Sequence, residues 1–198
     1  RITAKDIQYA REMGCEIKLL GVARLTEEGI EARVHPMLID SDHPLASVQD
    51  SYNAVFVRGD AVQDAMFYGR GAGELPTASA VVGDVFDCVR NILAGCCGRI
   101  GCTCYKDLPV RKISDIRSKY FVRMEVEDRS GVLASVAAVF GNNDVSISQV
   151  VQKRKKSELA EIVVITEKVQ ERHFMDAIRI LEGMSLIRNI SSLIRVYG

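Results

Sequence analysis

In residues 120–153, YFVRMEVEDRSGVLASVAAVFGNNDVSISQVVQK, the spacing of the apolar residues changes twice, from strand-like to helical and back. The rest of the C-terminal half continues this succession of strand and helix patterns. Residues 121–126 alternate, with Phe121, Arg123 and Glu125 on one side and Val122, Met124 and Val126 on the other, which predicts a strand. Residues 131–143 then carry apolar side chains at helical spacing, and residues 145–154 return to a strand pattern.

The pattern continues with a predicted strand over 159–169, a helix over 171–184 and a strand over 190–198. The order βαββαβ is the ferredoxin-like arrangement. One face of its sheet should lie under the helices, and the other should be left for solvent or for a second copy. A domain of about 80 residues has a modest core, so dimerisation would help to stabilise it.

The N-terminal half predicts an α+β layer. Residues 3–14 read as a helix that is N-capped by Thr3 and stopped by Gly14. Strands are expected over 16–26 and 30–39, joined as an antiparallel hairpin, and over 53–59. A glycine turn at 69–73, GRGAG, leads into a helix over 76–93, in which Cys88 occupies an apolar position expected in the core. We therefore predict a first domain over 1–94, a linker over 95–119 and a second domain over 120–198.

Composition narrows the class of protein. The 198 residues hold 26 Lys plus Arg and 26 Asp plus Glu, so no charge excess points to nucleic acid. The basic run 153–156, KRKK, is expected at a solvated hairpin tip. No apolar run reaches the roughly 20 residues of a membrane span, and no signal peptide is recognisable, so a soluble cytoplasmic protein is expected. Because the chain begins with Arg, we expect a piece of a longer protein.

Residues 127–153 resemble the ACT domain, a regulatory module that binds small ligands on amino-acid-biosynthetic enzymes. The matching residues are Asp128, Arg129, Gly131, Val132 and Leu133, whereas Ser130 and Ser146 depart from the usual proline and asparagine. The resemblance implies an amino-acid effector bound by Asp128, Gly131, Val132, Leu133, Ser146 and Ile147. Amide groups at a helix start can receive a carboxylate, and Asp128 can take the ammonium group.

Residues 14–24, 34–60 and 69–84 are similar to the catalytic region of homoserine dehydrogenase. That family interconverts L-aspartate 4-semialdehyde and L-homoserine with NAD or NADP, in threonine, methionine and isoleucine biosynthesis. The resemblance implies that Gly73 and Glu74 contact the cofactor and that L-threonine is the effector, bound between paired ACT domains of a homodimer or larger oligomer. It also implies that the Rossmann domain and the catalytic residues lie upstream of this chain, so the 198 residues alone should be inactive.

Other residue patterns indicate a nucleotide-binding or metal site less strongly. The glycine turn is not a Rossmann fingerprint, because Glu74 stands where its last glycine would be, and no P-loop occurs. His35 and His43, each before a proline, fit loop edges better than a metal pair. The cluster Cys96, Cys97, Cys102 and Cys104 lacks C-x2-C pairs, so no metal is expected there either.

A freestanding ACT-type amino-acid sensor without enzyme activity is the alternative. The helix after the glycine turn distinguishes the two. In the enzyme it would pack on the Rossmann domain, so Val81, Val85 and Val89 would be exposed in this chain; an isolated sensor should not expose such a stripe.

Overall fold

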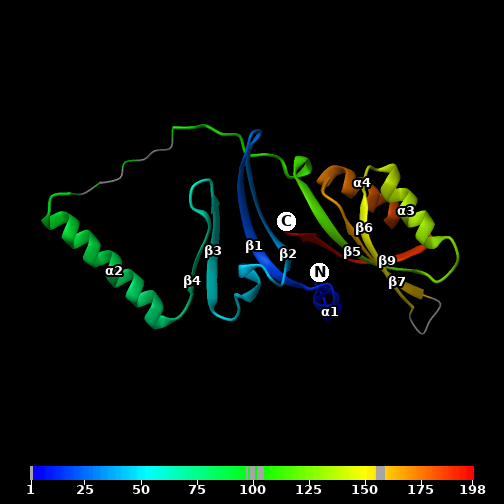
Figure 1. The fold of residues 1–198 in the computed structure, drawn as a ribbon, viewed down its shortest axis with the longest axis horizontal. Helices are drawn as coiled ribbons and strands as arrows, with labels where there is room; N and C mark the ends of the chain where they lie inside the picture. The colour runs from blue at the N-terminus through cyan, green and yellow to red at the C-terminus, as the bar shows by residue number, and fades with distance from the viewer. Residues whose placement is uncertain (1, 97, 99–100, 102–104, 155–158) are drawn as a thin grey trace. The chain divides into compact units, whose positions relative to one another are not determined.

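The computed structural model describes residues 2–96, 98, 101, 105–154 and 159–198, with the side chain of Arg154 left out. The chain forms two compact units, which we describe separately. The larger unit contains residues 1–41 and 108–198, and the smaller contains residues 42–107 (Figure 1).

The larger unit contains the predicted βαββαβ fold. Its elements are β5 (Arg117–Glu127), α3 (Val132–Asn142), β6 (Ile147–Arg154), β7 (Leu159–Thr166), β8 (Val169–Gln170), α4 (Glu171–Glu182) and β9 (Ile187–Val196). A short 3-10 helix, η2 (Ile113–Asp115), precedes them. The antiparallel order β9-β5-β7-β6 is that of a ferredoxin-like sheet, so this part of the prediction is confirmed.

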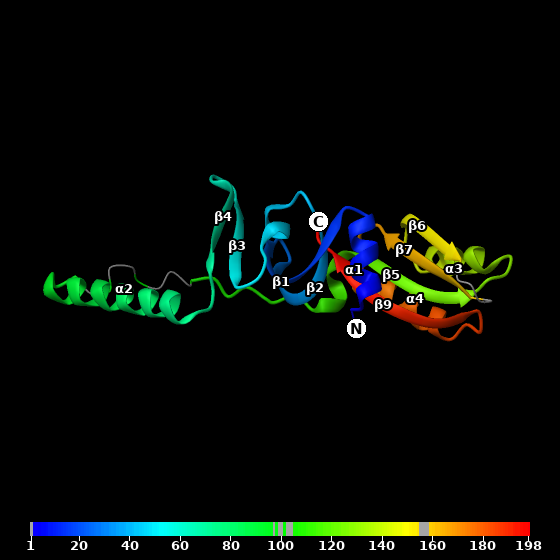
Figure 2. The same cartoon turned by 90° about the horizontal axis from the view of Figure 1, so that it is seen from below.

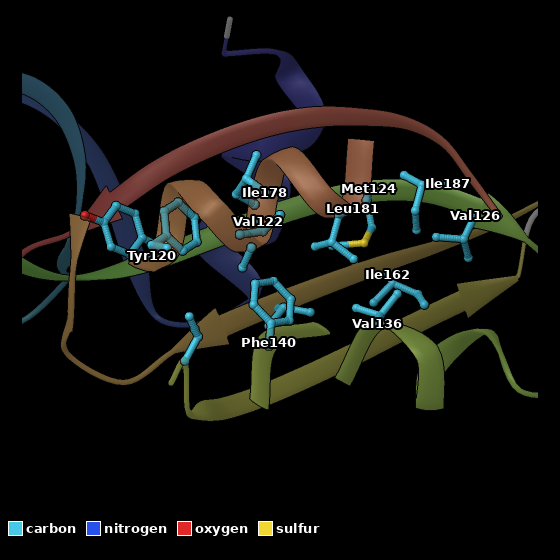
Figure 3. Close-up of a cluster of buried hydrophobic side chains, with 14 of the residues drawn as sticks. Tyr120, Val122, Met124, Val126, Val136, Phe140, Ile162, Ile178, Leu181 and Ile187 are labelled. Carbon is cyan, nitrogen blue, oxygen red and sulfur yellow. The ribbon is translucent and has the colours of Figure 1, made fainter. Parts of the chain in front are cut away.

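Helices α3 and α4 cover one face of this sheet (Figure 2). The buried cluster between the sheet and these helices comes from alternate residues of β5 and β7, from the start of β9 and from the inner faces of both helices. Figure 3 labels ten of its members: Tyr120, Val122, Met124, Val126, Val136, Phe140, Ile162, Ile178, Leu181 and Ile187. The predicted inner face of β5 is therefore correct.

The opposite face of the sheet is covered too, and here the expectation of an open face was wrong. Phe121 is fully buried and Arg123 is only 4% exposed. Helix α1 (Ala4–Glu12), N-capped by Thr3 as predicted, packs Tyr9 and Ala10 into a cluster with Phe121 on this face. The residue pattern of β5 could not reveal this, because the cover comes from a helix more than 100 positions upstream.

Strands β1 (Cys15–Thr26) and β2 (Gly29–Asp40) form the expected antiparallel hairpin, paired from Cys15–Asp40 to Thr26–Gly29. The hairpin joins the main sheet through parallel pairing of Met37 with Arg195 and Leu38 with Val196 in β9. Residues 1–41 thus share a compact unit with the βαββαβ domain and not with residues 42–94. The larger unit therefore combines stretches from both of the consecutive domains expected from the sequence, and the division into domains over 1–94 and 120–198 stays a prediction.

The smaller unit holds the 3-10 helix η1 (Pro44–Ser47), the hairpin of β3 (Tyr52–Gly59) and β4 (Gln63–Arg70), and α2 (Glu74–Leu93). The sequence analysis assigned no strand to β4, whose consecutive Met66, Phe67 and Tyr68 do not alternate. No residue of α2 is buried, and Cys88 is exposed, so its expected core position was wrong. Among the described residues no helix is long and apolar enough to cross a bilayer.

Candidate functional site

The glycine turn connects β4 to α2, as predicted. The amide of Gly71 donates a hydrogen bond to the Ser51 carbonyl at 3.2 Å, and a Cβ built on Gly71 would lie 1.5 Å from Nδ2 of Asn53. Gly73 is the N-cap of α2 with φ of +123°, a conformation that side chains other than glycine rarely adopt. Gly73 is therefore favoured by its backbone conformation, whereas a side chain at position 71 would force the Asn53 side chain or the turn to move.

Helix α2 begins at Glu74, two residues before the expected start. The first amide groups of a helix have no intrahelical acceptor, and Gly73 supplies no side-chain cap. Glu74 places a carboxylate in the first turn of the helix, where the dipole favours negative charge. The positions of Gly73 and Glu74 at this helix start suit a ligand contact, which remains a prediction.

The loop after β5 turns into α3 at Gly131, which has φ of +88° and N-caps the helix. The Gly131 carbonyl accepts hydrogen bonds from the amide and the hydroxyl of Ser135, at 2.9 and 3.1 Å. As the first residues of α3, Val132 and Leu133 have amides without an intrahelical acceptor. Asp128 is exposed beside this turn, so the predicted effector residues 128–133 lie together.

Ser146 and Ile147 lie at the other end of α3. They line a surface pocket together with Ala137, Gly141, Asp144 and Val145. The 11 residues of α3 span about 16 Å at the usual rise of ~1.5 Å per residue. The structure thus does not bring Ser146 and Ile147 to residues 128–133 within one chain. The predicted effector residues form two groups, and one small ligand could contact both only across two copies.

A buried ionic network, which the sequence analysis missed, joins α1 to the sheet. Arg123 donates to Asp6 Oδ1 at 2.7 Å and to Glu161 Oε2 at 2.9 Å. Tyr9 donates its hydroxyl proton to Glu161 Oε1 at 2.8 Å, and the Ser192 hydroxyl donates to Asp6 Oδ1 at 2.5 Å. The only sequence signal was the charge of Glu161, in a strand that is otherwise largely apolar, because Arg123 is one of several charged residues in β5.

The pKa values follow from these contacts. Burial, the largest effect on Asp6, raises its pKa, but hydrogen bonds from Arg123, Ser192 and Thr3 together lower it from 3.8 to about 2. Burial likewise opposes ionisation of Glu161, yet hydrogen bonds from Tyr9 and Arg123 give it a lowered pKa. Burial and the hydrogen bond to Glu161 raise the pKa of Tyr9. Both carboxylates are therefore held ionised inside the unit.

The histidines and cysteines form no metal centre among the residues described: no group of three or more His, Cys, Asp or Glu side chains is placed to hold an ion. His43 accepts a hydrogen bond from the Leu45 amide at Nδ1 and caps η1. His35 lies inside β2 and not at a loop edge, which corrects the expectation for that residue.

Two predictions fall wholly or partly outside the described residues. Cys97, Cys102 and Cys104 lie there, while Cys96 is half-buried. Lys153 and Arg154 of the basic run end β6, and the rest of the run is likewise outside.

Two family models match the chain. Residues 1–86 match homoserine dehydrogenase, and residues 120–183 match the ACT domain. The homoserine dehydrogenase of Neisseria gonorrhoeae is 38% identical over 202 residues, covering 99% of this chain and 46% of that protein. The enzyme of Corynebacterium glutamicum is 39% identical over 201 residues, covering 98% of this chain and 44% of that protein. The chain thus spans about half the length of these relatives.

Solved structures agree with this match. A homoserine dehydrogenase from Thiobacillus denitrificans superposes with a TM-score of 0.90 at 37% identity, over 100% of this chain and 46% of that one. The enzyme of S. aureus gives a TM-score of 0.63 at 27% identity, over 100% of this chain and 45% of that one. The two matched regions, in this order and in one superposition, show that residues 1–86 belong to the homoserine dehydrogenase family and that residues 120–183 are an ACT domain.

Proposed function

We propose that this chain is part of an NAD(P)-dependent homoserine dehydrogenase that interconverts L-aspartate 4-semialdehyde and L-homoserine, in the biosynthesis of threonine, methionine and isoleucine. The superposition of the whole chain on the T. denitrificans enzyme is the observation that carries the proposal. The cofactor supplies the hydride. This chain contributes the glycine turn, with Gly73 and Glu74 beside the cofactor, and the catalytic acids and lysine belong to other parts of the enzyme.

Exposure of α2 supports the enzyme over a freestanding sensor. Val81, Val85 and Val89 are 57%, 55% and 46% exposed, which is the stripe expected of a helix that packs on another domain. The carboxylate of Glu74 in the first turn favours contact with hydroxyl or amide groups of the cofactor over its phosphates.

The test is steady-state kinetics of the complete enzyme with NADPH or NADH and the semialdehyde. Gly73→Ala forces a side chain into a φ of +123° and should raise the KM for the cofactor about tenfold or more. Gly83→Ala is the control, because a Cβ there meets nothing within 4 Å and the residue lies inside α2. Equal KM values for the two variants would argue against a cofactor contact at the turn. The 198 residues alone should show no turnover.

We infer that the ACT domain binds L-threonine as a feedback effector between two copies. The separation of Ser146 and Ile147 from residues 128–133 supports a shared site, in which one chain supplies Asp128 and the helix start and the other supplies the strand start. A ligand that binds one arrangement of the pair more tightly would shift the enzyme toward that arrangement. The cytoplasmic location, and the absence of nucleic-acid and membrane partners, remain predictions.

Isothermal titration and size-exclusion chromatography of the complete enzyme test the effector site. Threonine should give saturable heat and favour the dimer or a larger oligomer. Asp128→Ala should abolish the heat, whereas Asp176→Ala, which removes an exposed carboxylate of α4 paired with Arg179, should not. No heat with threonine or any other amino acid would contradict an effector role for these residues.

A further inference from the structure

A polar pocket lies in the larger unit where the turn of the β1–β2 hairpin, the segment before β5 and the β7–β8 turn meet. Its lining includes four cationic side chains, Arg24, Arg111, Arg117 and Lys168. None of these residues belongs to the cofactor turn or to the predicted effector site. The lining also includes three carboxylates, so the balance of charge depends on which groups already pair with one another.

Arg111 is already neutralised. Its guanidinium lies 2.6 Å from Glu28 Oε2 and 2.7 Å from Glu31 Oε1, and it donates a further hydrogen bond to the Asp115 carbonyl at 3.0 Å. Glu31 is buried and Arg111 is largely so, so this set is part of the wall of the pocket. Arg111 and these two carboxylates together carry a net charge of −1, so this set offers no positive charge to a ligand and offsets one of the other cations.

The other three cations form no ion pair within the described part of the chain. Arg117 donates to the backbone carbonyl of Lys168 at 3.2 Å, and the guanidinium of Arg24 lies 5.8 Å from the ring centre of Tyr197. Glu27 is the one lining carboxylate outside the Arg111 set. Glu27 and the net negative charge of the Arg111 set offset two of these three cations, so the lining keeps a net charge of +1. Arg24, Arg117 and Lys168 carry N–H donors that can serve a ligand.

A buried arginine next to this pocket adds to the excess. Arg33 is on the same face of β2 as Glu31 and is 9% exposed. Its Nη1 donates to the Ser118 hydroxyl at 3.1 Å, while its buried Nε has no acceptor. Burial chiefly lowers its pKa, and the nearby charges of Arg24 and Arg195 lower it further, against the attraction of Glu31. A buried charged donor without an acceptor is costly unless another charge compensates.

We propose that this pocket binds a small anion bearing a phosphate or carboxylate group, held by Arg24, Arg117 and Lys168. A guanidinium pairs with either group in a two-pronged geometry, and the lysine adds a point charge. The bound anion reduces the repulsion between Arg24 and Arg33. Because the lining comes from the hairpin and from the βαββαβ domain, the anion bridges the two and stabilises their junction. This site is independent of the amino-acid effector.

The test is titration of the complete protein with inorganic phosphate and, separately, with succinate, each at constant ionic strength against chloride. We expect saturable binding of at least one probe and a rise in melting temperature with its concentration. Comparison of the two arms shows whether phosphate or carboxylate is preferred. Arg117→Gln and Lys168→Gln, both at exposed positions, should each weaken binding about tenfold or more.

Arg188→Gln is the matched control, since it removes an exposed positive charge from β9 outside the pocket and should leave affinity unchanged. Melting of each variant without anion shows whether it folds, and Lys168→Gln answers the question if Arg117→Gln does not fold. An equal loss of affinity in the control would mean unspecific charge attraction. Absence of saturable binding for both anions would overturn the proposal.

Discussion

Gly71 illustrates how one residue determines the shape of the predicted cofactor turn. Its amide is bonded to the Ser51 carbonyl, and the side chain of Asn53 occupies the space that a Cβ would need. The sequence motif identified the glycines of this turn, and we explained them by close contact with a ligand. The structure adds an internal reason for glycine at this position, because Asn53 comes from β3, the partner strand of β4.

Gly71→Ala should therefore destabilise the β3–β4 hairpin by about 1–3 kcal/mol, because the Asn53 side chain or the turn must move. Hydrogen exchange of the β3 and β4 amides measures the effect locally. Gly69→Ala is the control: a Cβ there meets nothing within 4 Å, and the change should stay within about 0.5 kcal/mol. Equal protection in the two variants would mean that the contact with Asn53 does not constrain the turn.

Asp6 should make stability depend on acid. Its folded pKa of about 2 lies below the ordinary 3.8, so its stabilisation is present above pH 4 and is lost as pH falls toward 2. The shift corresponds to about 2 kcal/mol. Urea unfolding of the parent and Asp6→Asn between pH 2 and 7 should show a difference that shrinks below pH 4. A difference that stays constant across this range would contradict the lowered pKa.

At the scale of elements, α1 explains why the second face of the sheet is buried. The helix itself was predictable from Thr3, Gly14 and its apolar spacing. The packing of α1 on the sheet was not predictable, because charged residues such as Arg123 in β5 and Glu161 in β7 are expected to face solvent. Their partners Asp6 and Tyr9 come from a distant part of the sequence, and a local pattern carries no information about such pairs.

Arg123→Ala should cost about 3–5 kcal/mol of unfolding free energy, because it leaves the buried carboxylate of Asp6 without its cation and Glu161 with only the half-exposed Lys5, whose Nζ lies 3.3 Å away. Arg129→Ala is the matched control. Its partner Glu127 lies at 2.8 Å, but Arg129 is 60% exposed, so the loss should be below about 1 kcal/mol. Urea unfolding at neutral pH compares them, and similar costs for both variants would mean that the α1 network contributes little.

At the scale of the whole molecule, the larger unit is assembled from two stretches separated by the smaller unit. The βαββαβ order predicts that residues 120–198 form a complete domain, and these residues lie within the second stretch, 108–198. In the structure, however, Phe121, Val163 and Ile194 of that fold are buried in a cluster with Tyr9, Ala10 and Leu38 of the first stretch. The domain has all the strands and helices of the βαββαβ fold, but one face of its sheet is covered by residues from the first stretch.

Residues 108–198 produced alone should consequently expose this cluster and unfold with a free energy lower by about 3 kcal/mol or more than in the 198-residue chain. Binding of a hydrophobic dye and urea unfolding measure both effects. A peptide of residues 1–14 added in trans should bind and reduce dye binding, whereas the same peptide with Asp6→Asn and Tyr9→Phe should bind more weakly. Equal stability of the two chains would contradict a structural role for α1.

Local pattern was sufficient for the βαββαβ order, the β1–β2 hairpin, the caps of α1 and the glycine turn, because alternation, helical spacing and capping residues act over a few positions. It was insufficient for β4, where apolar residues are consecutive, and for Cys88, whose apolar spacing indicates only that α2 has a face to bury. The cover of the sheet by α1 and the polar pocket lined by Arg24, Arg117 and Lys168 depend on segments that are far apart in the sequence and are brought together by the fold. Long-range packing, which sequence periodicity does not encode, decided those features.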